Sequence, residues 1–152
     1  MTDPIRLDGA TPRLDLPLLF AGQAQKEVFV NQALSALDGL VHCAIEGEAA
    51  APPAAPIDGT AWLVATGASG EWAGCDGLLA LRQTGQWLFA PPRDGMQVLD
   101  RGRRQMLHRV AGTWRAPARP PAPVGGAVID VEARAAIAAL VAALQQWAAF
   151  PA

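Results

Sequence analysis

Proline clusters divide this sequence more sharply than any other feature. Three prolines fall within residues 49–56 and four within residues 116–126. Proline lacks a main-chain N–H and has a fixed φ, so neither stretch can continue a helix or a central strand. The prolines and the glycine of the first 17 residues predict an extended arm for the same reason. The sequence therefore predicts four parts, namely an arm over residues 1–17, a domain over 18–115, a linker over 116–126 and a C-terminal helix over 127–152.

Composition indicates a globular protein with surplus apolar surface. Hydrophobic residues make up 51% of the 152 residues and charged residues 17%, below the roughly 25% of an ordinary domain. The net charge of −2 gives no overall attraction to nucleic acid or to an acidic membrane. The longest apolar run, residues 135–144, is far shorter than the roughly 20 residues that span a bilayer. We expect no nucleic acid and no membrane among the partners, and part of the apolar surface to face another protein.

The pattern of the predicted domain favours the α+β class. Apolar positions at helical spacing, among them Val30, Ala33, Leu34 and Leu37, predict a helix over residues 23–38, and Gly39 is expected to end it. Residues 40–45 favour a strand over a longer helix. Short β-rich runs between glycine turns then predict a small antiparallel sheet of hairpins. These runs are residues 61–65, 77–82, 86–90, 97–99, 105–110 and 113–115.

A short internal repeat lies within this predicted sheet. The pattern Arg-x-x-Gly-x-Trp begins at Arg82 and again at Arg109, and its tryptophans are Trp87 and Trp114. Each glycine falls between two β-rich runs. Two similar hairpins are the simplest explanation.

The C-terminal segment predicts an unusually apolar helix. Asp130 suits the N-cap, Glu132 complements the helix dipole, and residues 135–144 contain no polar side chain. A helix that is apolar all round must be covered on several sides. Two readings stay open, a helix wedged inside its own fold and a helix that packs against its copies around a symmetry axis. In the second reading the oligomer interface is the stripe Ile137, Leu140, Val141, Leu144 and Trp147.

The sequence lacks the common signatures of catalysis. It has no nucleophile elbow, no phosphate-binding glycine loop, no zincin helix and no paired cysteine ligands. His42 and His108 have no carboxylate or thiol in a short motif that would orient them, and the neighbours His42 and Cys43 point to opposite faces of a strand. Cys43 and Cys75 are expected to be reduced thiols. We therefore expect no enzyme, no metal and no cofactor.

Two weaker patterns admit a binding role and a structural one. The arginines between Asp100 and Val110 have flanking aspartates and no aromatic ladder, which favours a solvated hairpin over a phosphate grip. The tryptophans of the sheet suit its core or a platform for stacking sugars. The candidate glycan contacts are Trp72, Trp87 and Trp114.

Several strings of the sequence carry a family resemblance. The most specific is Gln23-Ala24-Gln25-Lys26-Glu27, followed by Asn31 and Leu37-Asp38, because polar residues stand at fixed places in an otherwise apolar helix. Further strings are Trp62-Leu63-Val64, Gly70-Glu71-Trp72, Gly85-Gln86-Trp87 and Phe89-Ala90-Pro91. With them, residues 11–115 resemble a domain family of bacterial prophages and gene transfer agents whose activity is undescribed.

The resemblance implies a structural component of a phage-like particle and supplies no catalytic residues. The short form resembles the base of a gene transfer agent head spike, which would link a capsid protein to a fibre protein. The arm would then contact the capsid or another partner through Arg6, Leu7, Arg13 and Leu14. Five-fold vertices would favour a homo-pentamer, and three-fold fibres a trimer.

The arm also bears on localisation, because residues 1–10 lack the pattern of a secretory signal. We expect a chain that is cytoplasmic when made and then joins the particle. The alternatives are a carbohydrate-binding module that contacts host surface polysaccharide and, more weakly, a tail-associated hydrolase fragment.

Overall fold

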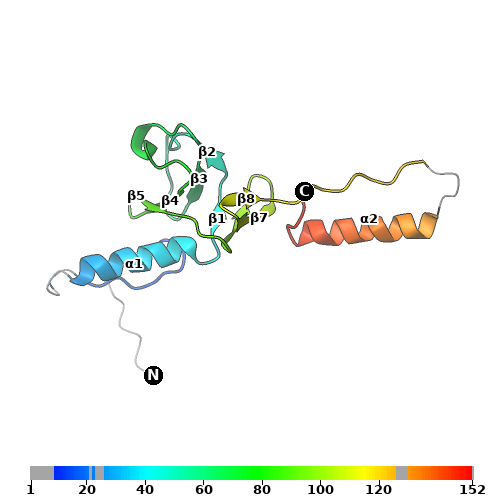
Figure 1. Cartoon of the computed structure of the whole chain (residues 1–152). Helices are drawn as coiled ribbons and strands as arrows, with labels where there is room; N and C mark the ends of the chain where they lie inside the picture. Colours follow the sequence, from blue (N-terminus) through cyan, green and yellow to red (C-terminus); the bar gives the residue numbers. More distant parts are fainter. Residues whose placement is uncertain (1–8, 21, 23–25, 126–129, 152) are drawn as a thin grey trace, which may run out of the picture. The chain divides into compact units, whose positions relative to one another are not determined.

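The computed structural model describes residues 9–20, 22, 26–125 and 130–151 and confirms the α+β class (Figure 1). Within these residues two α-helices and eight short strands are present, and the strands form two small sheets. The chain divides into two compact units, one ending at Pro92 and the other beginning at Arg93.

The first unit contains one helix and a four-stranded sheet with the order β2-β3-β4-β5. Its elements are α1 (Lys26–Leu40), β1 (Ala44–Ile45), β2 (Glu48–Ala49), β3 (Ala61–Val64), a 3₁₀ turn (Gly70–Trp72), β4 (Leu79–Gln83) and β5 (Gln86–Ala90). β2 runs parallel to β3, while β3–β4 and β4–β5 are antiparallel. The sheet is thus mixed rather than purely antiparallel, because the proline-rich residues 50–60 return the chain before β3 begins.

Both faces of this sheet are covered. Directly opposite residues such as Leu63 and Leu79 share one face, and Trp62 and Ala80 share the other. The helix α1 packs against the face that carries Leu81. The opposite face holds a cluster around the fully buried Trp72. Alternation along the strands therefore gives two apolar layers in a small unit.

A buried carboxylate joins three parts of the first unit. Asp38, at the end of α1, is fully buried and accepts hydrogen bonds from the Thr11 hydroxyl at 2.8 Å and from Gln83 Nε2 at 3.0 Å. The main-chain N–H groups of Arg13 and Leu14 also donate to it, the latter at 2.6 Å. Helix, arm and sheet are thereby held together at one side chain.

The C-terminus of α1 is capped by a side chain from the arm. The Arg13 guanidinium donates to the main-chain oxygens of Asp38, Gly39, Val41 and His42. These carbonyls have no partner inside the helix, and a cation is stabilised at this end of the helix dipole. Residues 9–17 of the predicted arm thus lie against α1 of their own chain.

The predicted helix is confirmed from Lys26 onward, residues 23–25 lie outside the described residues, and the predicted end is wrong. Gly39 does not end it; the helix continues to Leu40, and a Cβ at Gly39 would lie 2.5 Å from Leu81 Cδ1. Glycine is therefore needed for close approach of helix and strand. Two of the apolar positions whose spacing predicted the helix, Val30 and Leu37, are exposed.

The second unit contains β6 (Gln97–Asp100), β7 (Gln105–Val110), β8 (Thr113–Arg115) and α2 (Val131–Gln146). β6–β7 and β7–β8 are antiparallel. The C-terminal helix was predicted, and the Asp130 carboxylate caps it by accepting from Ala133 N at 2.8 Å.

The predicted pair of hairpins is confirmed by matching contacts. Arg82 lies opposite Trp87 and Arg109 opposite Trp114, with each guanidinium 5.2 Å or 5.6 Å from the centre of its ring. In both turns a residue with positive φ precedes a glycine with positive φ, the conformation of a two-residue hairpin loop. The repeat therefore encodes one turn and one cation–π pair, used twice.

Replacing Asp38 by Asn should lower the free energy of unfolding by about 3 kcal/mol at pH 7, because an amide group would face several buried donors. Urea denaturation followed by tryptophan fluorescence measures this loss. The exposed Asp15→Asn is the matched control and should change the free energy by less than about 0.5 kcal/mol. Equal effects of the two substitutions would contradict the role of Asp38.

The same pair tests a pH dependence. Burial by itself raises the pKa of Asp38, but hydrogen bonds from Thr11, Leu14, Gln83 and Arg13 bring the pKa below its ordinary value of 3.8. A carboxyl group with a lowered folded pKa stabilises fully above the ordinary value, and the contribution disappears as the pH falls through the folded value. The stability difference between the wild type and Asp38→Asn should therefore shrink below pH 3.8.

Replacing Gly39 by Ala should lower the free energy of unfolding by about 2 kcal/mol through overpacking against Leu81. By helix propensity alone, replacing glycine with alanine would stabilise the helix by about 1 kcal/mol. A net loss of stability would therefore show that the new methyl group clashes with Leu81. The substitution Leu81→Val removes the atom nearest the new methyl group. In that background Gly39→Ala should cost less, and an equal cost in both backgrounds would contradict the contact.

Candidate functional site

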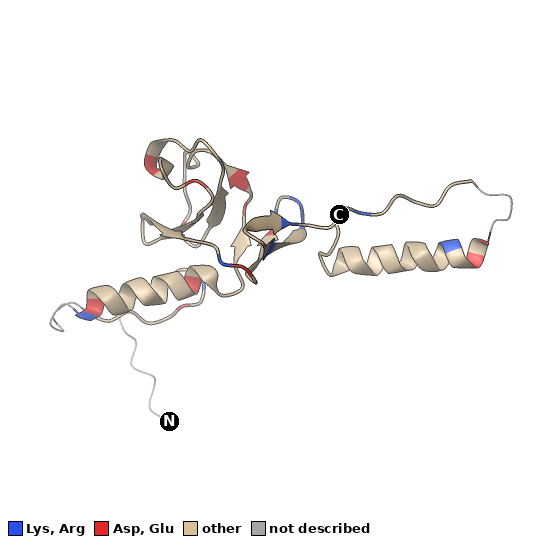
Figure 2. Ribbon diagram, in the orientation of Figure 1, with Lys and Arg blue, Asp and Glu red and all other residues tan. Residues whose placement is uncertain are grey.

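The helix α2 is the most exposed apolar element of the described chain. None of its residues is buried. Leu140 is 65% exposed, and Trp147, directly after the helix, is 82% exposed. The charged residues of α2 are Glu132 and Arg134 in its first turn, and Figure 2 shows the charge colours only at that end of the helix. An isolated helix of this length is marginally stable in water, and large exposed apolar surfaces are typical of interaction sites, so α2 is the candidate site.

Polar contacts tie down both ends of α2. At its N-terminal end, Arg134 donates to the main-chain oxygens of Pro123 and Gly125. At its C-terminal end, Ala148 O accepts from Met106 N at 2.7 Å. The buried Gln105 side chain donates to Pro117 O at 2.6 Å and Ala149 O at 2.9 Å. The start of β7 thus holds both the linker and the turn after α2.

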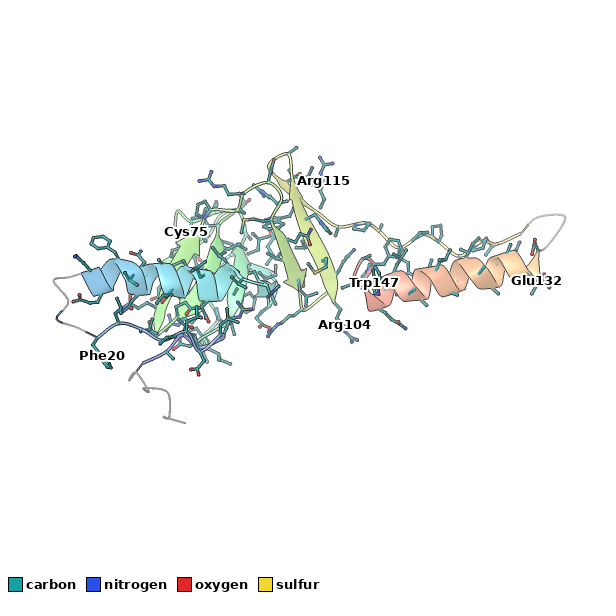
Figure 3. The ribbon with its side chains drawn as sticks, turned by 90° about the horizontal axis from the view of Figure 1, so that it is seen from below. Phe20, Cys75, Arg104, Arg115, Glu132 and Trp147 are labelled. Atoms are coloured by element: carbon teal, nitrogen blue, oxygen red, sulfur yellow. The ribbon has the colours of Figure 1, made fainter. Side chains whose placement is uncertain are left out.

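The predicted interface stripe lies together on α2 and on the turn that follows it. Ile137, Leu140 and Leu144 are exposed and Val141 is half-buried. Their spacing of three and four residues places them on one side of the helix. Figure 3 shows Trp147 at the opposite end of α2 from Glu132. Both readings, a helix wedged inside its own fold and an interface with other copies, stay predictions.

The predicted partner contacts of the arm fall into three groups. Arg6 and Leu7 lie outside the described residues. The Arg13 side chain is engaged with the end of α1, as described above. Leu14 is 42% exposed and is the one of these four whose side chain is described and open to a partner.

The predicted glycan contacts do not form one open platform in the first unit. Trp72 is fully buried. Trp87 packs at a steep angle against Trp72, 5.1 Å between ring centres, and its Nε1 donates to Glu71. Trp114 is half-buried beside Arg109. These rings serve packing, as the core reading of the tryptophans expects.

The remaining candidates for chemistry are placed as follows. His42 is exposed with a positive φ and accepts at its main-chain oxygen from Arg13. Burial raises the pKa of the Cys43 thiol, which disfavours the reactive thiolate, although Arg13 acts in the opposite sense. Arg103 pairs with Asp100, 3.7 Å from Nε to Oδ2. Within the residues placed by the structure, no three His, Cys, Asp or Glu side chains gather as metal ligands.

None of the helices among the described residues has the length and apolarity needed to cross a bilayer.

Two features of α1 were not predicted from the sequence. The outward side of α1 carries an exposed apolar stripe of Phe29, Ala33 and Leu37, with Phe29 74% exposed. The inward side carries Asn31, which bonds both main-chain groups of Leu19. Asn31 and Asp38 are seven residues apart, so they share a helix face, and this polar spacing was the available signal.

Comparison with known proteins identifies a family match. Residues 30–115, more than half of the 152 residues, match the family described as "protein of unknown function" (DUF2793). The matched range covers all eight described strands and most of α1, and it does not include α2. No curated protein matches the chain.

Proposed function

Because the chain belongs to the DUF2793 family, whose activity is undescribed, we propose that it is a structural component of a phage-like particle of the gene transfer agent type. In this proposal it forms the base of a head spike and links a capsid protein to a fibre protein. It acts by assembly and has no catalytic role.

The observation that carries the proposal is the exposed apolar surface of α2. Its stripe of large aliphatic residues is flanked by alanines, and small residues let helices approach closely. A surface of this composition is typical of protein interfaces. Copies of the same chain supply an identical helix, so association around a symmetry axis covers every stripe at once.

The placement of the family match supports a division of labour. The family domain ends at residue 115 and α2 follows the linker. The C-terminal contacts made by Gln105 couple α2 to β7. Assembly through α2 would therefore fix the matched domain in the particle and leave its surface open to capsid or fibre. The sequence resemblance to prophage and gene transfer agent proteins gives the setting.

The alternative function is a carbohydrate-binding module. It requires open aromatic rings, and the buried Trp72 and the packed Trp87 do not favour it. Binding of host surface polysaccharide that survives in a monomeric variant would revive it.

The central prediction concerns Leu140→Asp. We expect the wild type to be a homo-oligomer, a pentamer in the five-fold setting, and the variant to be a folded monomer. The reason is that an unpaired carboxylate inside the interface would be desolvated at a cost of several kcal/mol per copy. Light scattering coupled to size-exclusion chromatography measures the mass, and circular dichroism the fold.

Ala139→Asp is the matched control for this experiment. It places the same charge one residue earlier in the sequence, on the other side of α2, and should leave the oligomer intact. A wild type that is monomeric at high concentration contradicts the proposal. Equal dissociation by both substitutions would instead show that the stripe is wrongly assigned.

A second prediction separates the arm's attachment role from its structural one. Deleting residues 1–8 removes Arg6 and Leu7 but keeps Thr11 and Arg13, which contact the end of α1, so we expect a folded protein whose incorporation into particles is weaker. Deleting residues 1–17 should also destabilise the first unit, because Thr11 and Arg13 are lost. Both are measured by thermal unfolding and by immunoblots of purified particles. Normal incorporation of the shorter deletion would show that residues 1–8 are not the anchor.

A further inference from the structure

A groove in the first unit lies between α1 and the β4–β5 hairpin. Its volume is about 660 Å³, within the range of ligand sites. One wall comes from Leu18 and the inward side of α1, including Asn31, Gln32 and Ser35. The other wall is the hairpin, from Gln83 to Phe89.

The hairpin wall ends in an open strand edge. β5 is the last strand in the order β2-β3-β4-β5. Along an antiparallel pair such as β4–β5, hydrogen-bonded and non-hydrogen-bonded residue pairs alternate. The N–H of Arg82 donates to Thr60 O and its C=O accepts from Gly59 N, so both groups point toward β3 and away from β5. The residue opposite Arg82 is Trp87, so the main-chain groups of Trp87 and, two residues on, Phe89 point away from β4. Among the described residues nothing pairs with this edge.

A buried acceptor in the same groove also lacks a partner. Gln83 is 4% exposed, and its Nε2 donates to Asp38 at 3.0 Å. A carboxylate only accepts, so this bond fixes the orientation of the amide and leaves Oε1 as a free acceptor. Gln83 Oε1 has no hydrogen-bond partner among the described residues. The groove is therefore lined by a residue, Gln83, whose buried amide oxygen is unsatisfied.

The groove lining is uncharged. None of its eleven residues is Asp, Glu, Lys, Arg or His, and four are Asn or Gln. A phosphate, a carboxylate or a basic peptide would find no counter-charge there. The lining suits a neutral ligand with both hydrogen-bond donors and acceptors.

The aromatic residues distinguish between a sugar and a peptide. The Trp87 side chain lies on the sheet face opposite Leu88, where Arg82 covers it at 5.2 Å and Trp72 packs against it at 5.1 Å. The ring is thus on the side of the sheet away from Leu88 and α1, so a pyranose ring in the groove would not stack on it. The unpaired groups at the groove belong to the main chain of a strand, and an extended peptide complements them.

From these observations we infer that the groove between α1 and β5 binds an extended, uncharged polypeptide segment, which adds to the edge of β5. Main-chain bonds to Trp87 and Phe89 would hold the segment, and the uncharged side chains of the groove would contact it. This binding site is separate from the α2 surface and goes beyond the proposed function.

The test is selection of a display library of random twelve-residue peptides on the full-length protein. Enriched peptides should lack charged residues and should protect the amides of Trp87 and Phe89 from hydrogen exchange. Two N-methylated versions of an enriched peptide, one methylated at odd and one at even positions, each lose the N–H donors along one edge. The version methylated along the edge that faces β5 should bind about tenfold or more weakly than the unmodified peptide.

Substitutions in the walls of the groove complete the test. The double variant Gln32→Lys/Gln86→Lys places charge on both walls at exposed positions and should weaken binding of the enriched peptides about tenfold or more. Gln97→Lys, an exposed position on β6, is the matched control and should not change it.

Three outcomes would overturn the inference. In the first, the library yields no enriched peptide. In the second, neither N-methylation nor the double variant changes peptide binding. In the third, neutral maltohexaose protects the amides of Trp87 and Phe89 and the peptides do not. The mass of the oligomer should be the same in the double variant and the wild type, so failure here is distinguishable from failure of the α2 proposal.

Discussion

The first unit depends on the buried carboxylate of Asp38. A charge without solvent is destabilising unless hydrogen bonds replace the water, and here the hydroxyl of Thr11, two main-chain N–H groups and Gln83 do so. The same loop of the arm brings Arg13 onto the free carbonyls at the end of α1. One polar centre thereby fixes the arm, the helix and the hairpin, and it also orients the amide that faces the groove.

Local chemistry explains which parts of the fold were predictable. The hairpins were found because turn, arginine and tryptophan are encoded within six residues, and the C-terminal helix because Asp130 and the alanine run are local signals. Gly39 was read as a helix end because its contact with Leu81 is 42 residues away and leaves no local trace. The outward stripe with Phe29 was missed because apolar spacing does not say which side of a helix is covered.

The two candidate surfaces would use different physics. Along α2 the exposed groups are aliphatic, so association there would be driven by removal of apolar area from water and would be indifferent to main-chain direction. At the β5 edge the open groups are main-chain donors and acceptors, which are directional. The predicted site residues covered the first surface because side-chain composition reveals it. They did not cover the second, because an unpaired edge is a property of sheet order and not of any residue type.

The reach of the Asp38 contacts also affects folding on the ribosome. The helix α1 ends at residue 40, but the last hydrogen bond to its buried carboxylate comes from Gln83, and the strand that packs on Gly39 is β4. The helix α1 therefore cannot complete its buried contacts when it leaves the exit tunnel. It must wait for more than forty further residues, with its apolar side chains open to water and to chaperones. Contacts of such sequence separation slow folding, so α1 precedes most of the first unit in the sequence but is among the last of its parts to complete its contacts.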